Sequence, residues 1–209
     1  MRRYFAYMLL IVLSVAFAVN TSTSRAFAGG MKSVDIGEKI SEFKAVDLGG
    51  REQTLSSVKG KNGTVLIFIS VQCPISNAYN ERMEKLAKDY AAKGINVVGI
   101  NANSTEAVGV VKKHAAEHGF TFTILKDEGN KIADQLGAQH TPEAYLLDAS
   151  GKLVYHGRID NQKNVEMVSS NDLRDAIEAT LAGTRARGRR CRLGRCGRAV
   201  SSPLCRRTT

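Results

Sequence analysis

Apolar runs alternate with helix-period segments along the middle of this 209-residue chain. Continuous apolar and β-branched runs predict buried strands, whereas apolar positions spaced three and four residues apart predict amphipathic helices. Such an alternation is typical of an α/β fold built on a central sheet. We expect strands at 64–70, 95–101 and 122–127, and helices at 74–92, 105–118, 129–136 and 171–183.

Turn residues predict two hairpins and mark the last helix. Gly49 and Gly50 separate two short runs near the start, which would form an N-terminal hairpin extension. An Asp-Ala-Ser-Gly turn divides the segment 143–159 into two alternating strands. Asn171 is a candidate cap for the last helix, and Gly183 is a candidate stop.

The first 28 residues have the three parts of a cleavable export signal. Arg2 and Arg3 form a positive start, residues 4–19 form an apolar stretch, and the Ala-Phe-Ala of 26–28 fits a cleavage site. The alternative is a retained anchor, but this stretch is short for the roughly 20 residues of a spanning helix. We predict a signal peptide over 1–28, cut after Ala28, and a periplasmic or secreted protein without a stable membrane anchor.

The composition changes abruptly after the last predicted helix. Residues 185–209 hold nine arginines, no lysine and no acidic residue, whereas residues 29–184 hold fourteen lysines and four arginines. This Arg/Cys-rich tail, taken as 184–209, lacks apolar periodicity and is predicted to be disordered. Its composition fits either a native basic extension or translation in a shifted frame.

The net charge of +10 therefore does not describe the single domain predicted over 29–183. Residues 29–184 carry eighteen basic and twenty acidic side chains, a net charge of −2. Nucleic-acid-binding domains concentrate Lys and Arg on one face, and this region is close to neutral. We expect no nucleic-acid partner.

Cys73 is the first candidate for chemistry. It follows the run at 64–70 and precedes Pro74, a residue suited to the first turn of a helix. At a helix start, unpaired N–H groups and the helix dipole stabilise a thiolate, and such sites bring the cysteine pKa from about 8.5 to roughly 3.5–7.5. The alternative is an inert cysteine in the core.

The pair Thr141-Pro142 is the second candidate, because it stands directly before the strand-like run at 143–148. A proline at this position is either an edge or turn device or the residue after a cis peptide bond. Its value lies in combination with Cys73.

These segments together resemble the thioredoxin fold. They resemble more closely the redoxin branch, a peroxiredoxin-like group of the alkyl hydroperoxide reductase/thiol-specific antioxidant (AhpC/TSA) superfamily. The resemblance covers residues 36–183 and rests on "CPIS" at a helix start and on "TPEAYLLDASGKLVYHGRID". It implies an α/β fold with a central mixed sheet flanked by helices, and a cis-proline loop at Thr141-Pro142 that packs against Cys73. It also implies an antioxidant role in cell redox homeostasis.

Four positions depart from the better-known branches of that superfamily. Ser76 stands where thioredoxins have a second cysteine, so the motif is CxxS. Leu66 and Ser70 stand where peroxiredoxins have a proline and a threonine, and Pro142 aligns with their arginine. The resemblance therefore implies an attacking thiol at Cys73 without the full peroxidase set.

A lone thiolate can attack a disulfide or a peroxide, but Ser76 cannot resolve the product. We expect the Ser76 hydroxyl to donate a hydrogen bond to the thiolate and help to keep it ionised. Turnover then requires an external thiol reductant or the thiol of a partner protein. Alternatively, a tail cysteine completes the cycle. The tail cysteines are Cys191, Cys196 and Cys205.

The predicted function is that of an exported, thiol-dependent oxidoreductase without cofactor or metal ion. It would act by disulfide exchange or peroxide reduction through Cys73, Ser76, Thr141 and Pro142. The alternative is a non-catalytic module that binds a protein, a thiol or a metal ion through the same surface. The substrate, the electron donor and the oligomeric state stay open.

Five further side chains are weaker candidates. His140 is expected in an exposed loop, although it could tune Cys73 or share a metal ion with it. Arg158 and Asp160 could form a structural ion pair or lie near the site, and we favour the structural interpretation. His114 and His118 lie four residues apart on a predicted helix, where two histidines can bind a metal, but no acidic motif surrounds them. We expect them on a solvated face.

Overall fold

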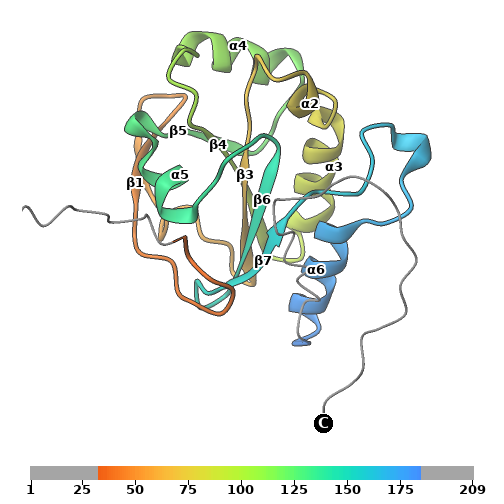
Figure 1. Cartoon of the computed structure of the whole chain (residues 1–209). Coiled ribbons are helices and arrows are strands. Elements are labelled where there is room, and N and C mark those ends of the chain that lie inside the picture. The colour runs from red at the N-terminus through yellow and green to blue at the C-terminus, as the bar shows by residue number, and fades with distance from the viewer. Residues whose placement is uncertain (1–32, 185–209) are drawn as a thin grey trace, which may run out of the picture. The chain divides into compact units, whose positions relative to one another are not determined.

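The computed structural model describes residues 33–184, which form seven strands and five α-helices around one sheet (Figure 1). The strands are β1 (Lys44–Asp47), β2 (Glu52–Thr54), β3 (Gly63–Phe68), β4 (Ile95–Asn101), β5 (Thr123–Lys126), β6 (Glu143–Asp148) and β7 (Leu153–Gly157). The helices are α2 (Pro74–Asn77), α3 (Asn80–Ala91), α4 (Val108–Glu117), α5 (Lys131–Leu136) and α6 (Asp172–Leu181), with 3-10 turns η1 (Glu128–Asn130) and η2 (Val165–Met167).

The strand order is β2-β1-β5-β4-β3-β6-β7. Strands β3, β4 and β5 are parallel neighbours, whereas β6, β7, β1 and β2 pair antiparallel. The sheet is therefore mixed, as predicted, and the N-terminal hairpin β1–β2 extends it at one edge. All six residues of β3 are buried, which fits a strand that lies between two neighbours with both faces covered.

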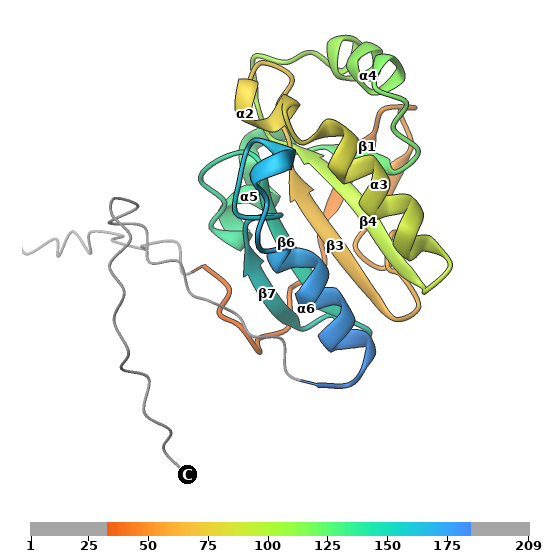
Figure 2. The same cartoon turned by 90° about the vertical axis from the view of Figure 1, so that its right-hand side faces the viewer.

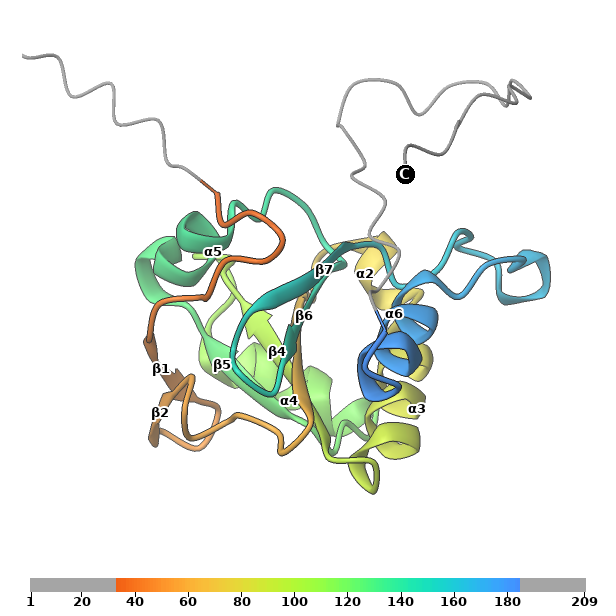
Figure 3. The same cartoon turned by 90° about the horizontal axis from the view of Figure 1, so that it is seen from below.

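Helices cover both faces of the sheet, with α3 and α6 on one side and α5 on the other (Figures 2 and 3). Because side chains alternate along a strand, Val65 and Ile67 of β3 belong to the core under α3 and α6. Leu66 and Phe68 belong to the core on the opposite face, under α5. The predicted flanked sheet is confirmed at the level of single side chains.

The predicted helix over 74–92 is wrong as one element, because it breaks after α2. Tyr79 has φ −105° and ψ 0°, and its amide bonds to the Ser76 carbonyl instead of continuing the α-helical pattern. A new helix, α3, then begins at Asn80. Cys73 therefore caps a helix of only four residues.

Two other helices begin later than predicted. Helix α4 starts at Val108 because residues before it form a turn, in which the Asn103 side chain accepts a hydrogen bond from the Thr105 amide. Helix α5 starts at Lys131, since Gly129 and Asn130 both have positive φ, at 73° and 58°. Glycine and asparagine tolerate that left-handed conformation better than other residues.

The end of α6 is close to expectation. Gly183 has φ +67° and the Thr184 amide bonds back to the Ala179 carbonyl at 2.8 Å, as in a glycine-terminated helix. Asn171 occupies the cap position, but its side chain makes no capping hydrogen bond; its carbonyl accepts from the Asp175 amide.

The predicted signal peptide (1–28) and almost all of the tail, with its three cysteines, lie outside the described residues. Within 33–184, no helix is both long enough and apolar enough to cross a membrane.

Candidate functional site

Cys73 lies where the chain turns from β3 into α2, at the carboxyl end of the central strand. It is the N-cap residue, with extended dihedral angles, and Pro74 occupies the first helical turn. The Ser76 amide donates a hydrogen bond to the Cys73 sulfur at 3.4 Å. The side chain is partly buried, so the sulfur is neither in the core nor fully in solvent.

The Thr141-Pro142 peptide bond is cis, and its loop contacts the cysteine. The Cys73 thiol lies 3.4 Å from the Thr141 carbonyl oxygen, to which it donates. Sheet pairing explains this contact across 68 positions, because Phe68 at the end of β3 pairs with Glu143 at the start of β6. The structure thus brings Cys73, Ser76 and the Thr141-Pro142 loop together.

The role of the Ser76 hydroxyl differs from expectation. Ser76 is buried, and its oxygen accepts a hydrogen bond from the Ser70 amide at 3.2 Å. The recorded hydrogen bond from Ser76 to Cys73 comes from its backbone amide. The hydroxyl therefore braces the loop before the cysteine, and the helix start supplies the donor.

The pKa of Cys73 is lowered, although not by a long helix dipole. Burial of the thiol raises the pKa, and hydrogen bonds from the Thr141 side chain and from the backbone of Ser76 and Ile75 outweigh that effect. The negative charge of Glu106 raises it again by a smaller amount. Because α2 is four residues long, the stabilisation of the thiolate is local.

Glu106 is the residue near the site that the sequence interpretation missed. It is 1% exposed, and its carboxylate accepts hydrogen bonds from the Ser70 hydroxyl at 2.6 Å and from the Val71 and Gln72 amides. A signal existed: Glu106 follows β4 in a polar stretch, and the carboxyl ends of neighbouring parallel strands meet at one edge of a sheet. Ser70 thereby has its hydroxyl proton directed at Glu106.

A second buried carboxylate supports the other side of the site. Glu143 follows Pro142, and its oxygens contact the Gln139 amide at 2.9 Å and the His156 ring at 2.5 Å. Burial raises the pKa of Glu143, but hydrogen bonds from His156 and Gln139 bring it below its ordinary value. His140 is 54% exposed, and its ring faces Glu143 at 3.7 Å. It is an exposed loop residue, as expected.

Arg158 and Asp160 do not form the predicted pair. Asp160 is buried and binds Arg82 at 2.5 Å, while Arg158 binds Asp172. Each has a structural partner from another element, which agrees with a structural role but not with a mutual bond.

The expectation of a solvated histidine pair is wrong for His114. That side chain is partly buried, its ring lies 3.1 Å from the Asn80 side-chain amide, and it packs against the tilted His118 ring with centroids 4.3 Å apart. Only His118 is exposed. In the described part of the chain, no group of three His, Cys, Asp or Glu side chains could hold a metal ion.

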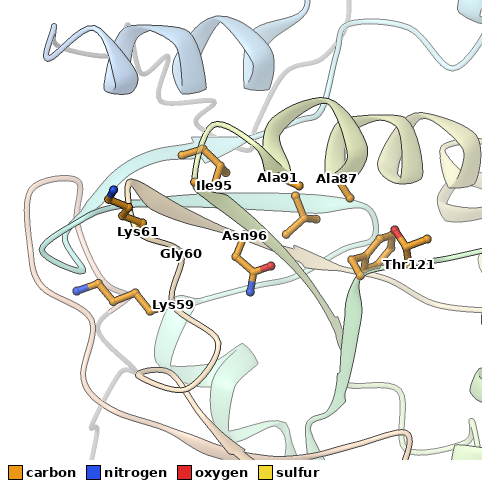
Figure 4. Close-up of a pocket in the computed structure, with 11 residues that line it drawn as sticks. Lys59, Gly60, Lys61, Ala87, Ala91, Ile95, Asn96 and Thr121 are labelled. Carbon is orange, nitrogen blue, oxygen red and sulfur yellow. The ribbon is translucent and has the colours of Figure 1, made fainter.

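Two surface hollows differ in their relation to the cysteine. One, of about 280 Å³, adjoins the site and is lined by Ser70, Asn103, Asn130, His140 and Thr141 among others. The larger, of about 340 Å³, lies at the opposite end of the sheet, with Lys59 and Lys61 at one end and Thr121 at the other (Figure 4). The chemistry points to the smaller hollow, because it touches the Thr141 loop.

A thioredoxin-like sheet with a partly buried cysteine against a cis-proline loop defines the class of thioredoxin-fold redoxins. A family model described as "AhpC/TSA family" matches residues 36–156. The chain belongs to the AhpC/TSA family.

The chain is similar both to proteins named thiol-disulfide oxidoreductase and to a protein named peroxiredoxin. The chain is 28% identical over 148 residues to a protein named thiol-disulfide oxidoreductase ResA of Bacillus thuringiensis (strain Al Hakam), covering 71% of this chain and 84% of that one. It is 31% identical over 137 residues to the chloroplastic peroxiredoxin Q of Sedum lineare, covering 59% and 70%. A solved structure of a hypothetical protein from Sinorhizobium meliloti 1021 is 34% identical, with a TM-score of 0.69 over 74% of this chain and 88% of that one.

Proposed function

We propose that this protein is an exported thiol-dependent oxidoreductase that acts by disulfide exchange through Cys73. The observation that carries the proposal is the sulfur itself, partly exposed, with a lowered pKa and with the Ser76 amide and the Thr141 carbonyl at 3.4 Å. The relatives named thiol-disulfide oxidoreductase support the same chemistry. The export signal predicted over 1–28 supports a periplasmic or secreted location.

The exchange has three balanced steps. The Cys73 thiolate attacks one sulfur of a substrate disulfide; that S–S bond breaks, and the other substrate sulfur leaves as a thiolate that takes up a proton. An external thiolate then attacks the substrate sulfur of this mixed disulfide; the bond to Cys73 breaks, Cys73 leaves as a thiolate, and the substrate sulfur is left in a disulfide with the external thiol. A second external thiol frees the substrate sulfur in the same way. Ser76 has no sulfur, and Cys73 is the one cysteine among residues 33–184, so the second thiol must come from a reductant, a partner protein or the tail.

Contacts around the cysteine favour disulfide exchange over peroxide reduction. Ser70 stands at the peroxiredoxin threonine position, but its hydroxyl donates to Glu106. Leu66, at the proline position, is fully buried in the core. Pro142 occupies the place of the arginine. Peroxide reduction would therefore be slow, and it would leave a sulfenate that consumes two external thiols to regenerate Cys73.

A non-catalytic binding module is the competing function. It is favoured by the absence of a second cysteine at Ser76 within the described chain, because such a site can hold a partner without turning over. The cis-proline loop and the hollow beside it would then be the binding surface.

The test combines alkylation of Cys73 with disulfide reduction. Peptide mapping after alkylation at a series of pH values should give a midpoint below the value of about 8.5 for a free cysteine. Insulin reduction with glutathione as the external thiol should be lost in Cys73→Ser and retained in the control variant His118→Ala. A midpoint at or above the free value, with no activity to lose, supports the binding module instead.

A further inference from the structure

Glu106 is a buried carboxylate that forms no ion pair within residues 33–184; hydrogen bonds surround it instead. It lies in the turn between β4 and α4, one strand away from β3 and the cysteine. A buried charge is costly unless it is paired or fully hydrogen-bonded. Packing alone therefore does not explain a carboxylate at this buried position.

On one side, the carboxylate accepts hydrogen bonds from the three consecutive residues before Cys73. The Ser70 hydroxyl lies 2.6 Å from Oε1, the Val71 amide 3.0 Å from Oε2, and the Gln72 amide 2.9 Å from Oε1. These donors belong to the loop after β3, which has left the sheet and has no ladder partners. The carboxylate takes the place of those partners and fixes the path of the chain into α2.

On the other side, the same carboxylate accepts from two asparagines. The Asn101 amide lies 2.6 Å from Oε2 and the Asn103 amide 3.0 Å from Oε1. Lys126, itself buried, holds this group from behind, because its ammonium contacts the Asn101 side chain and the carbonyls of Asn103 and Glu106. The carboxylate is thus fixed to β4 and β5 while it holds the cysteine loop.

Only an ionised carboxylate suits this set of donors. It is acceptor-only, with about four lone-pair sites on two oxygens, and here it receives five donors. An amide in its place would turn its own N–H groups toward some of those donors. The site therefore selects Glu over Gln, although the two side chains have nearly the same shape.

We infer that Glu106 is a positioning residue for Cys73, which holds loop 70–72 through its carboxylate and so sets where the sulfur stands against the Thr141-Pro142 loop. The inference rests on the proposed function in taking Cys73 as the nucleophile. Glu106 does not touch the sulfur's hydrogen-bond partners; it acts through the backbone that leads to the cysteine.

The charge of Glu106 opposes ionisation of Cys73, whereas its hydrogen bonds hold Cys73 in position for reaction. The charge raises the pKa of Cys73, so its removal populates the thiolate at lower pH. Loss of the hydrogen bonds frees the loop and moves the nucleophile out of position. The other titratable groups that face Glu106 are Lys126 and His114, whose pKa values it raises while burial lowers them.

The experiment compares Glu106→Gln with Glu117→Gln in the full chain. Glu117 lies on α4, is 57% exposed and pairs with Lys113 at 3.7 Å, so it changes the same charge without touching the loop. In Glu106→Gln we expect the alkylation midpoint of Cys73 to move to lower pH. We also expect hydrogen exchange at the Val71 and Gln72 amides to be faster by about tenfold or more. We also expect disulfide exchange to slow by about tenfold or more, as a misplaced reacting group does.

Two milder variants keep the inference testable if Glu106→Gln does not fold. Glu106→Asp retains the charge but is too short for all five donors, so the alkylation midpoint should stay near that of the wild type while the amides exchange faster. Ser70→Ala removes one donor and should speed amide hydrogen exchange at Val71 and Gln72 by a smaller factor.

An unchanged alkylation profile and unchanged amide exchange in the folded Glu106 variants would overturn the inference, whatever their stability. Equal effects in Glu117→Gln would overturn it as well. If the wild type reduces no disulfide, the proposed function fails, but alkylation and amide exchange still decide the role of Glu106 because neither needs a substrate.

Discussion

The sulfur of Cys73 owes its reactivity to a few local contacts. Hydrogen bonds from the Thr141 side chain and from the backbone of Ser76 and Ile75 act on a partly buried thiol, and together they lower its pKa despite burial. Ser76 contributes through its main chain, while its side chain holds the Ser70 amide. At this scale, two backbone donors of the helix start and one side chain of the facing loop act together on the sulfur.

Ser76→Ala separates these two contributions. Removal of the buried hydroxyl leaves the Ser70 amide without this acceptor, which should cost about 1–3 kcal/mol of unfolding free energy. The alkylation midpoint of Cys73 should stay almost unchanged, because the amide that donates to the sulfur remains. Urea unfolding and pH-dependent alkylation measure the two effects. A large rise of the alkylation midpoint would instead mean that the Ser76 hydroxyl donates a hydrogen bond to the Cys73 thiolate.

Glu143 makes stability depend on acid. Its folded pKa lies below the ordinary value of 4.5, so its stabilising contribution is complete above that value and is lost as pH falls through the folded pKa. In urea titrations between neutral pH and pH 3, Glu143→Gln should flatten the decline of unfolding free energy toward acid. The control Glu52→Gln, at an exposed residue paired with Lys44, should leave the wild-type slope. An unaltered slope in Glu143→Gln would assign the acid dependence to other carboxylates.

At the scale of elements, sheet pairing assembles the site. Parallel neighbours β3 and β4 deliver Cys73 and Glu106 to one edge, and antiparallel β6 begins at that edge with the residue after Pro142. Helix α3 is held against the segment after β7 by Arg82. That guanidinium binds Asp160 and the Gln162 and Lys163 carbonyls, and it lies 3.6 Å over the Tyr79 ring.

Arg82→Ala should be among the most destabilising substitutions outside the cores. Asp160, whose side chain is 3% exposed, would keep a buried charge without its partner, a loss of about 3–5 kcal/mol. Lys85→Ala on the same helix removes an exposed pair with Asp89 and should cost less than about 1 kcal/mol. Chemical denaturation of both variants gives the difference. Equal stabilities would mean that Arg82 contributes no more than a surface ion pair.

At the scale of the whole molecule, patterning specifies the fold better than it specifies the site. The run at 95–101 predicts both ends of β4 correctly, because a buried strand is marked by a continuous run of apolar residues. The helix over 74–92 fails because the apolar periodicity continues through Tyr79, where the backbone turns. The role of Glu106 is not predicted because its partners in loop 70–72 lie 34 to 36 positions away, and only the strand order brings them together.

The end of the sheet remote from the cysteine depends on close backbone packing at Gly60. A Cβ there would lie 2.2 Å from the Gly63 carbonyl oxygen and 2.6 Å from the Asn96 nitrogen, so Gly60→Ala should lower stability by about 1–3 kcal/mol or more. Gly109 is the matched control, because a Cβ meets nothing within 4 Å and the residue is helical. Gly109→Ala should raise stability by up to about 1 kcal/mol. Thermal unfolding should move the two variants in opposite directions, and a shared direction would contradict this packing account.

The lone sulfhydryl between residues 33 and 184 has one more consequence. A domain with two thiols can form an intramolecular disulfide and so release its substrate. No such bridge can form within residues 33–184: unless a tail cysteine closes one, oxidised Cys73 carries either an oxygen atom or the molecule with which it reacted, as a mixed disulfide. Rapid acid quenching and intact-mass measurement would then read the identity of that molecule directly from the added mass.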